Sequence, residues 1–157
     1  MENILAMVLP LLIAFLGAMF GAYFAVVKSK KERLWTERFE ALRSVVKSAE
    51  LICYDSEVST LEDYGLRVMS AAEREKLSHS MLESKHELRE SMSLLKLLFK
   101  PKVIQSMLDA YDDVNDAILK LSNHRPDEYR PDYFHDIRGA AMVLVNETTG
   151  LAARKCL

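Results

Sequence analysis

The most prominent feature of the hydropathy pattern is a long apolar segment near the N-terminus. From Ile4 to Val27 no side chain carries a charge. A helix of this length rises about 36 Å, enough to cross a hydrocarbon core of about 30 Å. A soluble core helix of that length would need a polar face, and this segment has none. The pattern therefore predicts a transmembrane helix in residues 1–27.

After this segment the apolar residues recur at helical spacing. Between residues 28 and 54 they follow steps of 4, 3, 4, 3 and 4, in a stripe made of Trp35, Phe39, Leu42, Val46, Ala49 and Cys53. No Gly or Pro separates this stripe from the apolar segment, so we expect one continuous helix. The stripe is typical of a bundle core, although a coiled coil between copies of the chain is an alternative.

Three further helices are expected in residues 55–157. Ser70 and Glu73 have the spacing of a capping box, and Pro101 suits the first turn of the next helix. Asp132 is expected to cap the last helix, which would end near Gly150. The apolar stripes are Leu77, Met81, Leu88, Met92 and Leu95, then Ile104, Met107, Tyr111, Val114, Ile118 and Leu121, and finally Phe134, Ile137, Ala141, Leu144, Thr148 and Leu151.

The segment from Asp55 to Met69 is less periodic, and its pattern leaves open a plain connection and a connection that contains one short helical turn. Within it, Tyr64 to Met69 is an alternative short strand. The predicted fold class is all-α, with one N-terminal transmembrane helix followed by a small cytoplasmic helical bundle.

The basic residues indicate an orientation in the membrane. All 21 Lys and Arg residues follow Val27, starting with Lys28, Lys30 and Lys31. The positive-inside rule then places the N-terminus outside and the C-terminal domain in the cytoplasm, as in a single-pass protein of the cell inner membrane. A cleaved signal peptide is the competing interpretation, but it requires basic residues before a shorter apolar run.

The charge balance limits the partners. The chain has a formal net charge of −2, which argues against bulk nucleic-acid binding. From Lys28 to Glu50, however, seven basic residues outnumber four acidic ones. This excess suits the anionic headgroups of a lipid bilayer, or serves only to set the topology.

Small residues line one side of the apolar segment. Gly17 and Gly21 form a GxxxG pair that Ala25 extends, while Ala14 and Ala18 lie on the adjacent ridge. Small residues at this spacing let two membrane helices approach closely, so we predict a homo-oligomer with this interface.

A second cluster occupies the polar segment before the last helix and the start of that helix. It contains two histidines, three arginines and a tyrosine, namely His124, Arg125, Arg130, Tyr133, His135 and Arg138. Guanidinium groups near a helix N-terminus favour phosphate, and tyrosine rings stack on bases. A nucleotide or another anionic ligand is one interpretation, and a rigid, salt-bridged connection is the other.

Metal and catalytic signatures are weak. Glu83 with His86 and Asp132 with His135 have the spacing of half a di-metal site, but the first pair lies opposite the apolar face of its helix. The chain has no GxSxG, no phosphate-binding glycine loop and no HExxH. We therefore expect no metal, no cofactor and no enzymatic activity.

The segment from Lys30 to Leu42, which reads KKERLWTERFEAL, resembles small bacterial and phage membrane proteins with a basic helix directly after one anchor. In arrangement and size the chain is also similar to the small type III CRISPR membrane effectors of bacterial antiviral defence. That family forms tetramers, binds cyclic tetra-adenylate and responds by disturbing the membrane. The resemblance implies a tetramer and a cyclic oligoadenylate ligand, with Arg125, Arg130, Tyr133 and Arg138 as first residues to replace.

The expected function is that of an oligomeric bacterial membrane effector or sensor. Its cytoplasmic domain would bind a ligand and perturb the assembly of the membrane helices. The alternative is a membrane-tethered interaction or scaffold module without a small ligand.

Overall fold

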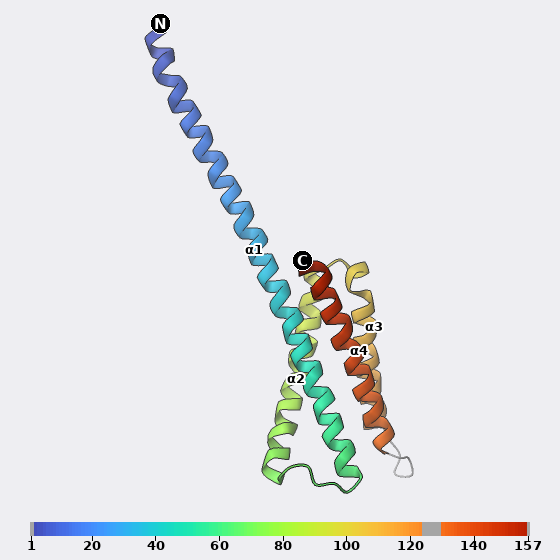
Figure 1. Cartoon of the computed structure of the whole chain (residues 1–157). Coiled ribbons are helices and arrows are strands. Elements are labelled where there is room, and N and C mark those ends of the chain that lie inside the picture. Colours follow the sequence, from blue (N-terminus) through green and yellow to red (C-terminus); the bar gives the residue numbers. More distant parts are fainter. Residues whose placement is uncertain (1, 124–129, 157) are drawn as a thin grey trace. The chain divides into compact units, whose positions relative to one another are not determined.

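The structure is a computed structural model that describes residues 2–123 and 130–156. It contains four helices, which are α1 (Glu2–Asp63), α2 (Ala71–Leu98), α3 (Pro101–Ser122) and α4 (Arg130–Cys156). Figure 1 shows them in chain order from blue to red, and no strand occurs in the described residues. The chain divides into two compact units, Met1–Glu37 and Arg38–Leu157. The all-α fold class is confirmed.

The first unit contains the apolar segment of α1 and the charged turns that follow it, up to Glu37. Among the described residues, α1 is the one helix long and apolar enough to cross a membrane, with a mean hydropathy of 1.7 in its most apolar window. None of that window is buried within the chain. Pro10 lies inside α1 without ending it. This segment is therefore a candidate membrane span.

The predicted starts of α2 and α3 are confirmed. The Ser70 hydroxyl accepts a hydrogen bond from the Glu73 N–H at 3.3 Å, and the Glu73 carboxylate accepts one from the Ser70 N–H at 2.8 Å. The Ser70 hydroxyl also donates to the Glu73 carboxylate at 2.7 Å, and this bond first, then that from the Ser70 N–H, holds the pKa of Glu73 below its usual value. Pro101 occupies the first turn of α3, where its missing N–H costs no helical hydrogen bond.

The segment of residues 55–69, which the sequence pattern left open, is helical for more than half of its length. α1 continues to Asp63, because Ser56, Val58 and Ser59 are buried and keep its inner face packed. The short strand at Tyr64–Met69 does not form. Instead the chain turns at Gly65, whose φ of 80° lies in the left-handed region that favours glycine.

Two predicted boundaries of α4 are also wrong. Asp132 lies in the first turn of the helix rather than at its cap. In the first turn its negative charge interacts favourably with the positive end of the helix dipole. The helix continues past Gly150 to Cys156. Burial of Leu151 accounts for this extension, since an apolar contact on the inner face offsets the poor helix propensity of one glycine.

The second unit is a bundle built on the predicted stripes. All six stripe residues of α4 are buried, and so are Ile104, Met107 and Val114 of α3. In α1 the buried face differs from the predicted stripe and contains Ala41, Leu42, Val45, Ser48, Ala49 and Ile52. Trp35 and Phe39 are exposed. The shift arises because α2 and α4 both pack against α1, so its buried face is centred between the two contacts.

Side-chain contacts show that α1 packs antiparallel to α2 in the second unit. At one end the Arg38 guanidinium donates to the Leu98 carbonyl at 2.7 Å and lies 4.7 Å from the Phe99 ring centroid. In the middle the Ser91 hydroxyl donates to the Ser44 hydroxyl at 2.8 Å. The adjoining packing of α3 on α4 includes a hydrogen bond of 2.7 Å from Ser106 to Glu147.

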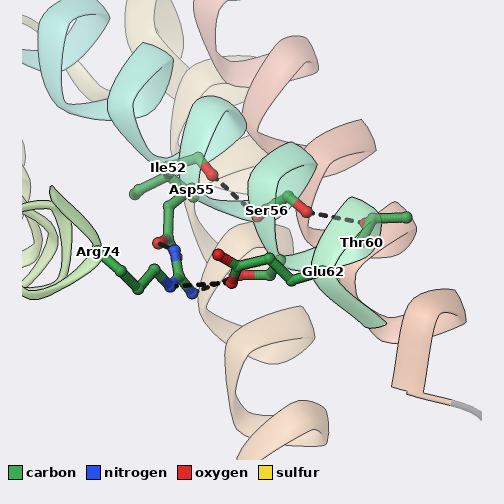
Figure 2. A network of polar contacts seen from close by, with 7 residues as sticks. Ile52, Asp55, Ser56, Thr60, Glu62 and Arg74 are labelled. Carbon is green, nitrogen blue, oxygen red and sulfur yellow. Dashed lines mark hydrogen bonds and ion pairs between the residues drawn. The ribbon is translucent and has the colours of Figure 1, made fainter. Parts of the chain in front are cut away.

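The other end of the α1–α2 pair is joined by Arg74. Its guanidinium lies 2.8 Å from Asp55, 3.2 Å from Glu62 and 2.8 Å from the Ser59 hydroxyl. Figure 2 shows Arg74 reaching from α2 to Asp55 and Glu62 on α1. Since each nitrogen faces an oxygen, this network sets the register of α2 on α1.

We predict that Leu95→Ala lowers the free energy of unfolding of the bundle by about 2–5 kcal/mol, because it leaves a cavity at a side chain with no exposed surface. Leu97→Ala is the matched control, since Leu97 is on the same helix and is 84% exposed. The control is expected to change stability by less than about 0.5 kcal/mol. The measurement is urea denaturation of the full-length protein in detergent, followed by circular dichroism. Equal losses in the two variants would contradict this packing.

Candidate functional site

The predicted anionic-ligand residues lie around the start of α4. His124 and Arg125 are outside the described residues, and Arg130 is the first residue of α4, its side chain not described. Tyr133 is half-buried, whereas His135 and Arg138 are exposed. The described members of this set therefore share one helix end but differ in burial.

Tyr133 and Arg138 face different neighbours. Tyr133 lines a hollow of about 460 Å³ with Asp116, Leu119, Lys120 and Asn123 from the end of α3. Arg138 lies toward α1, where its guanidinium is 3.9 Å from the Glu57 carboxylate. The structure thus brings Tyr133 together with α3 residues and does not bring it together with Arg138 in the same hollow.

A second candidate site is the groove between α1 and α4, with a volume of about 390 Å³. Apolar side chains and charged groups line it in similar number, which makes it amphipathic. Its lining residues are Phe39, Leu42, Arg43, Val46, Lys47 and Glu50 from α1, and Thr148, Thr149 and Ala152 from α4.

The polar groups of this groove differ in availability. The Thr148 hydroxyl donates to the Leu144 carbonyl at 2.7 Å and the Thr149 hydroxyl donates to the Val145 carbonyl at 2.8 Å, so both are already used within α4. Lys47 lies 3.5 Å from the Glu87 carboxylate, in an ion pair that solvent screens. The groove therefore offers an apolar floor with an exposed charged rim, which suits an apolar segment or an amphiphile.

No protein family, curated protein or solved structure matches this chain. Among the described residues no group of three or more His, Cys, Asp or Glu side chains is placed to hold a metal ion. Glu83 and His86 are exposed on α2.

The sequence indicated half of the α1–α4 groove. Phe39, Leu42 and Val46 belong to the predicted stripe, and the structure places them on the side of α1 that faces α4. The other wall was missed, because Thr148 was assigned to the core of α4 and Thr149 carried no signal. These two threonines form one wall of a groove only because α1 lies next to them on the other side.

The Cys53 thiol lies in the same α1–α4 seam. It donates to the Arg138 carbonyl, with 3.7 Å between sulfur and oxygen, and it is half-buried. Burial raises the pKa of Cys53 above its usual value; Arg138 opposes this shift, and Glu50 and Glu57 add to it. The proton is therefore held more tightly in the folded protein than in the unfolded chain.

We predict that Cys53 reacts more slowly with iodoacetamide in the native protein than in urea, because the thiolate is the reacting form. The measurement uses a Cys156→Ser background at pH 8. By the same shift, Cys53 contributes stability below the usual thiol pKa of 9.0, and this contribution is lost as the pH rises above it. Equal rates in the native and unfolded protein would contradict the shift.

Proposed function

We propose that this protein is a membrane-anchored effector or sensor. In this proposal the bundle binds a cytoplasmic ligand, and binding changes the self-association of the N-terminal helices. The observation that carries it is that α1 supplies both the candidate membrane span and one of the four helices of the bundle. A change in bundle packing then acts directly on the helix that holds the anchor.

The energy for such a response is the difference in ligand affinity between two arrangements of the bundle. A ligand that binds both equally shifts neither population. The chemistry of residues 124–138 supports an anionic ligand, with a cyclic oligoadenylate as the candidate that the resemblance implies. Since Tyr133 and Arg138 face different sides of α4, the proposal has the ligand bridge neighbouring subunits of an oligomer, with Tyr133 and Arg138 supplied by different copies.

The self-association part of the proposal rests on Gly17 and Gly21. Within the described chain, nothing lies within 4 Å of a Cβ built at either glycine, so a neighbouring helix has access to this ridge. The N-terminus is assigned to the outside and the bundle to the cytoplasm, as the distribution of Lys and Arg favours.

We predict that cyclic oligoadenylates bind the full-length protein in lipid nanodiscs, as measured by calorimetry. Replacing both Arg125 and Arg130 with Ala is expected to weaken binding at least about tenfold, because each charge-assisted hydrogen bond contributes about 1.5–3 kcal/mol. Arg89→Ala, at an exposed arginine of α2, is the matched control and is expected to bind as the wild type does. No heat with any cyclic oligoadenylate, together with intact membranes in cells that express the protein, would refute the sensor.

The α1–α4 groove favours a second candidate function, a membrane-tethered interaction module without a small ligand. Its apolar floor includes Phe39, which is 48% exposed. In that case a pull-down recovers one stoichiometric protein partner. Binding of this partner is lost on Phe39→Ser and is unchanged by the arginine replacements. Leu82→Ser, at an exposed leucine of α2 outside both candidate sites, serves as the control.

A further inference from the structure

A cluster of cations follows the apolar segment directly. Lys28, Lys30, Lys31 and Arg33 are all exposed, and Glu32 is the one acidic residue among them. The Lys28 ammonium lies 3.8 Å from the Glu32 carboxylate, with both side chains mostly exposed, so this pair is weak. The cluster keeps a net positive charge at the end of the candidate span.

Two of these lysines share one face of α1 with aromatic residues. Phe24, Lys28, Lys31 and Trp35 follow steps of 4, 3 and 4, which places them above one another on a helix. They line a shallow hollow of about 510 Å³ that also includes Val27, Glu32 and Thr36, so its two lysines outnumber its one carboxylate. Lys30 and Arg33 point to other sides of the helix and do not line the hollow.

The order of groups along this face matches a phospholipid. Phe24 and Val27, on the apolar side, suit the upper part of an acyl chain, and the two ammonium groups come next, where a phosphodiester would lie. Lysine stems pack along apolar surface while their charges reach the headgroup level, and tryptophan is favoured at the same interface. A soluble phosphate would use only the lysines and would leave the apolar part of the hollow unoccupied.

We propose that Lys28 and Lys31, together with Phe24 and Trp35, form a binding site for one anionic phospholipid at the end of the membrane span. The inference rests on the membrane placement of α1 in the proposed function and adds the class of lipid that this face selects. Anionic lipid bound here fixes the depth and the rotation of α1 at the C-terminal end of the candidate membrane span.

The test uses the full-length protein in detergent, with fluorescence of Trp35, the only tryptophan in the chain, as the readout. Three ligands are titrated, namely short-chain phosphatidylglycerol, short-chain phosphatidylcholine and inorganic phosphate. Only phosphatidylglycerol is expected to give a saturable change. One cation near an anionic lipid contributes a factor of about five in affinity, so Lys28→Gln with Lys31→Gln is expected to weaken binding about 25-fold.

The matched control is Lys30→Gln with Arg33→Gln, which removes the same charge at the same level from other faces of the helix. It is expected to weaken phosphatidylglycerol binding by at most about fivefold, well below the loss in the Lys28 and Lys31 double variant, because its charges act on the lipid only from a greater distance. An equal loss in both double variants, or an equal response to phosphate or phosphatidylcholine, would overturn the site.

Flotation with phosphatidylcholine vesicles distinguishes the absence of the lipid site from the absence of a membrane span. Protein that floats without preferring phosphatidylglycerol retains its membrane anchor and lacks the lipid site. Protein that does not float at all refutes the lipid site and the proposed function together.

Discussion

The bundle depends on the burial of one face of α1 against the other helices. Val45, Ala49 and Ile52 have no exposed surface, and the stripes of α3 and α4 complete the same core. The backbone that carries these residues also carries the apolar segment of the first unit. One helix therefore serves two environments, and the change from exposed to buried apolar residues takes place along it.

The contacts that hold α1 differ in character from those between α3 and α4. Between α1 and α2 some of the packed side chains are serines rather than larger apolar residues. Ser44 and Ser91 contact each other through their hydroxyls. The Ser48 hydroxyl is buried and has no hydrogen-bond partner among the described residues. An unsatisfied buried hydroxyl costs about 1–3 kcal/mol, so this seam is less strongly stabilised than an apolar one. The proposed sensor requires two packing arrangements of close free energy, and a weakly stabilised seam is where such a pair would be expected.

The candidate sites follow from which helices become neighbours. Tyr133 and Arg138 lie five residues apart on α4, yet the first lines a hollow with α3 and the second lies beside Glu57 of α1. Their closeness in sequence and their chemistry predicted one common site. In the bundle, however, the two side chains face different neighbouring helices. The α1–α4 groove shows the reverse, because residues about 100 positions apart form one surface.

The sequence by itself determined the elements whose cause is local. The uncharged run up to Val27, the Ser70–Glu73 capping box and the Pro101 start depend only on neighbouring residues, and the 3–4 spacing of α3 and α4 needs only some core to face. Tertiary structure decided the rest. α1 extends to Asp63 and turns a different face inward because α2 and α4 pack on either side of it, and the partners of Arg74 and Tyr133 are set by helices distant in sequence. Periodicity reports that a helix has an apolar face, but the direction of that face is fixed only when the neighbouring helices pack against it.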